Sequence, residues 1–250
     1  MDTDPYERFA ERYDWFYESF ADHDPGKMEF FRELFARYQV KSVLDCACGT
    51  GRDLHLLRSL GCEVFGSDRS VAMLAQAERN LATHRANVPL DLVDYRELHL
   101  HYARDFDAVV CLSSSICEMP EQSDVVQAFA SMRNVLRDGG ILVVSSGISD
   151  MTWRQKPRFI PEVWKDDFLR LFVVDYIGDG ARFNAIDLHR NSVLNRMESW
   201  AITYNRVYLR DDLDRALAAA RFRKCTFYGD YLFEPYDRAT SSMLVAVAEK

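Results

Sequence analysis

The stretch Val43–Gly51, VLDCACGTG, joins a short apolar run to an acid and then to two glycines one residue apart. A helical pattern, GRDLHLLRSLG, follows at once and stops at Gly61. The sequence therefore predicts a strand, a tight turn and a helix that begins near Arg52. Glycines in such a turn let the backbone take positive φ values and approach a ligand closely, and the helix N-terminus presents free N–H groups. The turn is a candidate ligand-binding site.

The two cysteines of this stretch, Cys46 and Cys48, raise a second interpretation, a metal or redox site. A structural zinc site needs four ligands, usually as two closely spaced pairs, and a redox pair is more often Cys-x-x-Cys. The nearest further candidate ligands are His99 and His101, and their spacing does not complete a four-ligand set. On a strand the two cysteines share one face, so we interpret both as small buried thiols and predict no metal.

Beyond the turn, strand and helix patterns alternate. Apolar runs lie at 41–47, 62–68, 88–95, 106–114 and 141–147. Helical patterns lie between them, one capped by Ser70 and another closed by Gly139 and Gly140. This alternation predicts an α/β fold, a doubly wound, mostly parallel seven-stranded sheet with helices on both faces.

Three segments depart from the alternation. Residues 151–207 show period-two patterns and turn signals, which predict an antiparallel β insertion. Residues 208–250 predict a closing helix and a hairpin, with the last strand antiparallel. Residues 6–38 predict two helical runs, separated by DHDPG, and the first of them carries Tyr13 and Tyr17 one turn apart.

The net charge and the distribution of apolar residues restrict the classes of partner that we expect. The chain has 250 residues, a formal net charge of -8 and a pI of about 5.3, so a phosphate-rich partner such as nucleic acid is disfavoured. The acidic, aromatic start lacks the features of a signal peptide, and no apolar run approaches the ~20 residues of a membrane span. We expect a cytoplasmic protein, a monomer or homodimer, with no membrane partner.

The acids at the strand ends indicate which ligand the turn binds. Asp68 ends the second strand, 23 residues after Asp45, where an acid accepts hydrogen bonds from ribose hydroxyls. A dinucleotide fingerprint would require a third glycine at the position of Leu54. Asp45 leads into the turn and suits a cation better than a diphosphate. S-adenosylmethionine carries a sulfonium, an ammonium and a ribose but no phosphate.

At this point the sequence resembles the class I S-adenosylmethionine-dependent methyltransferases. The resemblance is carried by VLDCACGTGRD, EVFGSDRSVAMLAQA, LVDYREL, FDAVVCL and NVLRDGGILVV, in order, over residues 40–146. It implies one domain over 1–250: an N-terminal helical lid (1–38), a cofactor-binding core (40–150), a β insertion that forms a lid over the substrate site (151–207), and a closing helix and hairpin (208–250).

The resemblance also implies roles for individual residues. Asp45, Ala47 and Gly49 would face the methionine moiety, beside Gly51 and with Leu112 beneath it. Asp68 would hold the ribose. The adenine would lie among Arg69, Met73, Asp94 and Tyr95, and Tyr13 would close over the cofactor.

Methyl transfer to an amine needs little more than alignment, whereas a hydroxyl acceptor usually needs a general base. The weak catalytic signature therefore favours an amine of a small molecule. The C-terminus, CTFYGDYLFEPYDRATSSMLVAVAEK, is similar to that of the glycine and sarcosine N-methyltransferases, and AERYDWFYESF to a segment of the amino-sugar N-methyltransferases. The glycine enzymes place an asparagine and a substrate-gripping arginine where this chain has Ser114 and Gly147.

Several side chains are candidates for the acceptor site. Replacements for the missing arginine are Arg154, Lys156 or Arg158, each of which is equally a solvated basic residue. Catalytic candidates are Tyr13, Tyr17, Ser114 and Tyr228, and His189 and Tyr204 lie within the insertion. O-methyl transfer, a non-catalytic cofactor-binding protein and an NAD-dependent reductase remain as alternatives.

Overall fold

The computed structural model describes residue 4, residues 6–190 and residues 195–250. Within these residues the core is a seven-stranded sheet of order β10-β11-β5-β4-β1-β2-β3. Strands β1 to β5 pair in parallel, and β11 runs antiparallel to both β5 and β10, which confirms the predicted fold class. The strands of this sheet are β1 (Ser42–Asp45), β2 (Glu63–Asp68), β3 (Leu90–Leu92), β4 (Phe106–Cys111), β5 (Leu136–Ser146), β10 (Lys224–Tyr228) and β11 (Leu244–Glu249).

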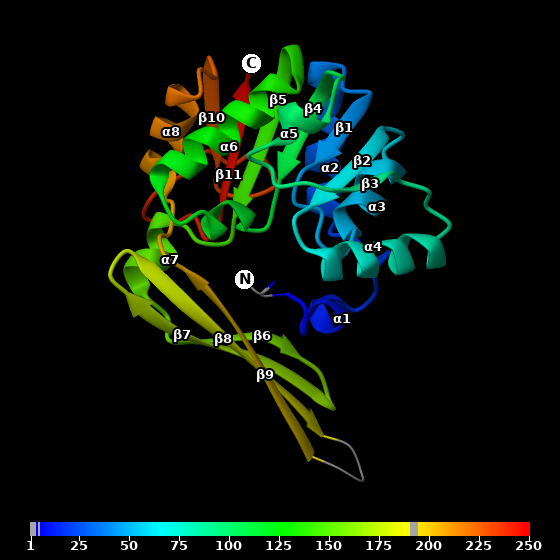
Figure 1. Ribbon diagram of the computed structural model, residues 1–250. Coiled ribbons are helices and arrows are strands. Elements are labelled where there is room, and N and C mark those ends of the chain that lie inside the picture. The colour runs from blue at the N-terminus through cyan, green and yellow to red at the C-terminus, as the bar shows by residue number, and fades with distance from the viewer. Residues whose placement is uncertain (1–3, 5, 191–194) are drawn as a thin grey trace.

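Helices cover both faces of this sheet (Figure 1). One face carries α2 (Pro25–Tyr38), α3 (Arg52–Ser59) and α4 (Val71–Thr83), and the other carries α5 (Leu98–His101), α6 (Gln122–Asn134) and α8 (Arg210–Ala219). Side chains along β5 alternate between the two cores, with Val143 in one and Val144 in the other. Because both faces are covered, the central strands are apolar throughout.

The glycine pair Gly139 and Gly140 lies inside β5, and not at the end of α6 as predicted. The pairing of β4 with β5 shifts register here. A Cβ at Gly140 would lie 2.9 Å from the carbonyl oxygen of Arg137 and 3.0 Å from that of Asp107. The glycines therefore permit a close backbone approach at a bulge, which is why they do not act as a helix cap.

The N-terminal segment is less regular than the sequence predicts. α1 (Ala10–Tyr13) leads into a 3₁₀ turn, η1 (Asp14–Phe16), and the backbone is extended at Tyr17. The carboxylate of Asp14 accepts hydrogen bonds from Thr50 Oγ1 at 2.5 Å and from Asn80 Nδ2 at 2.7 Å. These contacts with the core bend the chain, so the continuous first helix with two tyrosines on one face is wrong.

The insertion is a separate four-stranded antiparallel sheet of order β6-β7-β8-β9, within the described residues. The three predicted antiparallel segments correspond to β7 (Phe168–Ile177), β8 (Gly180–Arg190) and β9 (Asn195–Tyr204). The sequence analysis missed α7 (Asp150–Gln155) and the edge strand β6 (Phe159–Trp164). β6 contains Pro161 and a register shift beside it, which hid the period-two pattern.

The two sheets lie on opposite sides of the N-terminal segment (Figure 1). The C-terminal end of the antiparallel β11 lies at the top of Figure 1, so the carboxyl ends of the parallel strands point down toward the four-stranded sheet. The N-terminal segment with α1 lies between the two (Figure 1). Among the described residues, none of the helices is both long and apolar enough to cross a membrane.

Candidate active site

A cavity of about 820 Å³ lies between the carboxyl edge of the seven-stranded sheet and the four-stranded sheet. Its floor comes from the strand ends and the turns that follow them, one wall from the N-terminal segment, and its roof from the insertion. Small-molecule pockets occupy roughly 300–1,000 Å³. The cavity is therefore large enough for a cofactor together with a small acceptor.

Most of the predicted site residues line this cavity. They are Tyr13, Tyr17, Asp45, Ala47, Gly49, Asp68, Arg69, Met73, Tyr95, Leu112 and Ser114, and Tyr204 joins them from the insertion. The structure thus brings together residues from both ends of the sequence. Their individual roles remain predictions.

The glycine turn has the backbone conformation that its sequence indicates. Gly49 and Gly51 have φ values of +52° and +85°, and Gly51 is the residue before the first turn of α3. A Cβ added to Gly49 would meet no atom within 4 Å, so the space above this residue is open to a ligand. Gly51 does not line the cavity; its conformation positions the turn.

Asp68 is fixed in place by the backbone around it. Its Oδ2 accepts a hydrogen bond from the Gly49 N–H at 2.8 Å, and its Oδ1 accepts one from the Ser70 N–H at 2.9 Å. Burial raises the pKa of Asp68, and these two hydrogen bonds partly offset that rise. Ser70 also caps α4 as predicted, since its hydroxyl accepts from the Met73 N–H. A carboxylate held at both oxygens is well placed to accept from a diol.

Asp45 is a buried acid beside a second acid. It is 2% exposed, and one hydrogen bond, from the Ala47 N–H at 3.2 Å, reaches its carboxylate. Burial and then the neighbouring Asp53 raise its pKa well above the ordinary value. Asp53 itself pairs with Lys27 at 2.7 Å, so Asp45 is left without a cation of its own among the described residues. A cationic ligand would supply one.

Three segments meet at Glu118, which the sequence analysis missed. Its carboxylate accepts hydrogen bonds from the Tyr6 hydroxyl and from Arg69 Nη2, the latter at 3.0 Å. Burial raises the pKa of Glu118, and these two donors act in the opposite direction. The Tyr6 ring lies 5.5 Å from that of Trp200 in the insertion. Glu118 therefore links the N-terminal segment to the adenine side of the predicted cofactor site.

The two N-terminal tyrosines present hydroxyls without a hydrogen-bond partner among the described residues. Burial raises the pKa of Tyr13 well above its ordinary value and, together with Asp53, raises that of Tyr17 to about 12. Both phenols therefore stay protonated at neutral pH. The Tyr17 ring also carries the Arg52 guanidinium at 3.9 Å from its centroid.

The segment after β4 contains two consecutive non-glycine residues in the left-handed region. Ser113 and Ser114 have φ values of +57° and +66°, a conformation that costs roughly 1–3 kcal/mol per residue. The Ser114 hydroxyl lies 3.2 Å from that of Ser146 and accepts from the Gly147 N–H at 3.0 Å. The Ser114 side chain is thus held by the loop after β5. Ser113 is the exposed one of the pair and faces the cavity.

Some predicted residues lie outside the cavity. The carboxylate of Asp94 accepts from Arg96 Nη2 at 2.7 Å; burial alone would raise its pKa, but Arg96 lowers it. The Tyr228 ring packs 5.3 Å from Phe233 and does not reach the lining. His189 of the insertion packs against Phe168 of the same sheet and against Trp15 of the N-terminal segment, and it also lies outside the lining.

The basic residues proposed as an acceptor clamp are also outside the lining. Arg154 donates to the Arg238 carbonyl, and Arg158 pairs with Asp175 at 3.3 Å. Lys156 lies over the rings of Trp153 and Tyr176 at 5.1 and 5.6 Å.

The cysteines of the glycine turn are buried thiols, but they do not share a face. β1 ends at Asp45, so Cys46 and Cys48 follow the strand, and they belong to the two different cores of the sheet. The Cys46 thiol donates to the Val110 carbonyl at 3.3 Å. Burial raises the pKa of both thiols well above the ordinary value, which keeps them protonated.

Sequence reasoning missed several charged and aromatic residues of the lining. These are Tyr6, Phe16, Lys27, Arg52, Asp53, Glu118, Glu162 and Trp200. Asp53 could have been predicted from the sequence, because it lies in the first turn of the helix that follows the glycines. Glu162 carried no signal, since the strand that presents it was itself not recognised.

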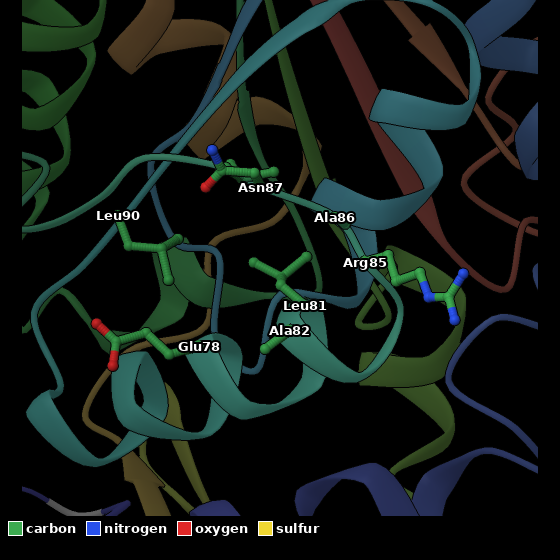
Figure 2. Close-up of a pocket in the computed structure, with 8 residues that line it drawn as sticks. Glu78, Leu81, Ala82, Arg85, Ala86, Asn87 and Leu90 are labelled. Carbon is green, nitrogen blue, oxygen red and sulfur yellow. The ribbon is translucent and has the colours of Figure 1, made fainter.

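A smaller hollow of about 480 Å³ lies at the C-terminal end of α4. Leu81 and Leu90 form its apolar surface, and Glu78 and Arg85 extend to opposite sides of them (Figure 2). It shares none of its described lining residues with the larger cavity. Its polar side chains among the described residues, Glu78, Arg85 and Asn87, lie apart and do not converge on one point (Figure 2), so we assign no site to it.

Comparison with known proteins agrees with this geometry. A family model described as a methyltransferase domain matches residues 43–140. The glycine/sarcosine N-methyltransferase of Aphanothece halophytica is 29% identical over 98% of this chain and 89% of that enzyme. The enzyme of the same description from Parasynechococcus marenigrum (strain WH8102) is 34% identical, over 57% of this chain and 48% of its own length.

Solved structures show the same fold over nearly the whole chain. The CcbJ methyltransferase of Streptomyces caelestis has a TM-score of 0.83 at 20% identity, over 99% of this chain and 98% of that one. The sugar N-methyltransferase KedS8 of Streptoalloteichus sp ATCC 53650 has a TM-score of 0.66 at 26% identity, over 95% and 93%. The chain therefore contains a methyltransferase domain over residues 43–140 and has the fold of S-adenosylmethionine-dependent methyltransferases, and S-adenosylmethionine is its cofactor.

Proposed function

We propose that the protein transfers a methyl group from S-adenosylmethionine to an amine nitrogen of a small molecule. The observation that carries the proposal is a single cavity that joins Asp45 and Asp68, at the sheet edge, to an aromatic space under the insertion. The names of the relatives above, N-methyltransferases acting on glycine, sarcosine or a sugar, support nitrogen as the accepting atom.

The residues of the floor fit the cofactor. Asp68, oriented by two backbone N–H groups, would hold the ribose hydroxyls. Asp45, a buried acid without a cation of its own, would face the positively charged methionine end, and Lys27 and Arg52 also line the floor and could face the carboxylate of the cofactor. When bound, S-adenosylmethionine supplies a methyl group activated by its sulfonium sulfur.

In this proposal the chain contributes alignment and exclusion of water. Tyr13 and Tyr17 would close the cavity as walls and hydrogen-bond donors, because their phenols stay protonated. Ser113 and the positioned Ser114 would shape the floor below the reacting nitrogen. An amine that arrives unprotonated needs no general base, and well-aligned reactants gain roughly 7–11 kcal/mol from proximity alone.

We also propose that residues 1–38 and 151–207 act as lids over the core formed by 40–150 and 208–250. Contacts across the cavity support this division. Lys165 of the insertion donates to the Tyr17 carbonyl at 3.3 Å, and the Phe9 ring stacks on Trp200 at 3.9 Å. We propose a monomer or homodimer for the solution state, to be measured by light scattering.

Transfer of labelled methyl from S-adenosylmethionine to a pooled panel of amines and phenols tests the proposed function. We expect label on amines and none on phenols, with Asp68→Ala as a control that weakens cofactor binding and lowers transfer to every acceptor. Label on phenols alone would make the protein an O-methyltransferase. Tight cofactor binding without transfer to any acceptor would contradict an enzymatic role.

A further inference from the structure

The roof of the cavity carries one charged side chain among the described residues. The insertion contributes thirteen residues to the lining: Thr152, Trp153, Pro157, Phe159, Ile160, Pro161, Glu162, Phe172, Tyr176, Phe183, Trp200, Ile202 and Tyr204. All but Glu162 are uncharged, and most are aromatic or aliphatic. Whatever acceptor lies under this roof meets one carboxylate and a large apolar surface.

Glu162 has no hydrogen bond or ion pair with any described residue. It projects from the edge strand β6, and the nearest charge that affects it is Arg170 on the neighbouring strand. Arg170 is held by Asp187 through Nε and Nη2 at 2.7 and 2.8 Å, and no hydrogen bond joins it to Glu162. Glu162 is exposed at this edge of the cavity, and partial desolvation raises the pKa of its carboxyl group while Arg170 acts in the opposite direction.

The cations that line the cavity among the described residues are at the floor, and two of the three are paired with acids. Lys27 pairs with Asp53 at 2.7 Å, and Arg69 pairs with Glu118 at 3.0 Å. Arg52 packs on the Tyr17 ring and donates to the Asp22 carbonyl. Arg52 has no acid partner among the described residues, but it directly follows the glycine turn, on the cofactor side of the cavity. No cation of the described residues lines the roof, so an acceptor carboxylate or phosphate held there would be desolvated without an ion partner, which is costly.

The roof also presents aromatic side chains to a ligand in the cavity. Phe159, which precedes Glu162 on the same strand, is 61% exposed and lines the cavity, so its ring is available to a ligand. Phe172 packs near Phe16 of the N-terminal segment at 5.9 Å. An apolar body seated on these rings would bury surface that the protein alone leaves open.

We propose that the roof selects non-acidic amines with an apolar body, with Glu162 holding an ammonium or amine N–H of the acceptor. This inference rests on the proposed function and narrows its substrate class. It separates this chain from acceptors that bear a carboxylate, such as glycine and sarcosine, and from phosphorylated acceptors such as nucleotide-linked sugars. Glu162 is here a binding residue for the acceptor and has no contact with the cofactor.

Matched acceptor pairs test this directly. Labelled methyl transfer is compared between 2-phenylethylamine and phenylalanine, and between methylamine and glycine, since each pair differs by one carboxylate. We expect transfer to the amines and at least about ten-fold lower kcat/KM for the acids, the effect of one unpaired buried charge. An equal or higher rate with the acids would overturn the inference while leaving the proposed function in place.

Variants of Glu162 sharpen the test. E162Q should raise KM for 2-phenylethylamine about ten-fold or more while the Kd for S-adenosylhomocysteine stays unchanged, and E162K should instead bring phenylalanine transfer up relative to the wild type. E78Q makes the same chemical change outside the cavity and should alter neither quantity. An unchanged KM in E162Q would contradict the assignment. Absence of transfer to any amine, with cofactor binding intact, would overturn the proposed function itself.

Discussion

The two sheets of the molecule are held in place by different forces. In the seven-stranded sheet, β1, β4, β5 and β11 are buried on both faces by apolar side chains. The four-stranded sheet has a small buried core of Val174, Ala181 and Val207. Its contact with the N-terminal segment combines aromatic packing, such as Phe9 on Trp200, with a buried ion network centred on Arg170.

This network is compact, and Arg170 at its centre keeps one guanidinium nitrogen, Nη1, without a hydrogen-bond partner. Arg170 is fully buried and pairs with Asp187 at two positions, and Arg12 of the N-terminal segment reaches the same carboxylate at 3.2 Å. The Arg170 guanidinium also lies 4.3 Å from the Phe16 ring centroid. The cofactor edge is thus built on a strong local apolar pattern, whereas the acceptor side is assembled from ionic and aromatic contacts between distant segments.

The largest effect should come from breaking the ion network. Arg170→Met leaves Asp187 buried with Arg12 alone, and removing one partner of a buried pair costs roughly 3–5 kcal/mol. We expect a loss of that size in the free energy of unfolding, measured by urea denaturation. The double variant Arg170→Met, Asp187→Leu should recover much of it. A single variant as stable as the wild type would show that apolar packing alone holds the insertion.

The next effect should lie at the cofactor edge. Asp68→Ala should weaken S-adenosylmethionine binding ten-fold or more, since hydrogen bonds to a charged group contribute roughly 1.5–3 kcal/mol. Asp94→Ala removes an acid already held by Arg96 outside the lining. Calorimetric Kd values for the two variants should therefore differ clearly. Equal losses would mean that both acids contact the cofactor.

A smaller effect is expected at the wall between the two regions. Tyr13→Phe removes a hydroxyl without a described partner, so turnover should fall by about three- to ten-fold, the value of one hydrogen bond of 0.5–1.5 kcal/mol. The melting temperature should stay the same. Tyr228→Phe, whose ring packs against Phe233, should leave turnover unchanged. If Tyr228→Phe lowered turnover and Tyr13→Phe did not, the hydroxyl that matters for turnover would lie on the closing hairpin.

The smallest effect should be a pH dependence of stability beside the core. His23 Nε2 lies 2.8 Å from His55 Nδ1, and burial, together with Arg52 and His55, lowers the pKa of His23 from 6.5 to about 4. Between these values the unfolded chain binds more protons, so stability should fall as the pH drops from 6.5 toward 4. His23→Gln should flatten this slope in urea titrations. An identical slope in both proteins would assign it to other groups.

The contrast between the two sheets also explains what the sequence could predict. The central strands and their helices were predictable because burial on both faces leaves uninterrupted apolar runs, and because Ser70 and the glycine turn mark element ends. The positions of Asp45, Gly49 and Asp68 in the cavity followed from the rule that parallel strands end at one edge. These features depend on local sequence.

The remainder depends on contacts between distant segments. Asp14 bends the N-terminal helix because Thr50 and Asn80 bind it, which no local pattern reveals. Glu162 lines the cavity from the edge strand β6, and Pro161 in that strand interrupts the period-two pattern by which the sequence would have indicated it. Tyr228 looked like a site residue by resemblance, yet packing on its neighbours keeps it outside. The acceptor side of the cavity was therefore only partly predictable.

The most direct test of this division is hydrogen–deuterium exchange with S-adenosylhomocysteine bound. We expect protection of the turns at 45–53 and 66–73 and of the N-terminal segment 9–17, with little change in β6 until an amine acceptor is added. Protection confined to the four-stranded sheet, or none at the sheet edge, would contradict the claim that the core holds the cofactor and the insertion the acceptor.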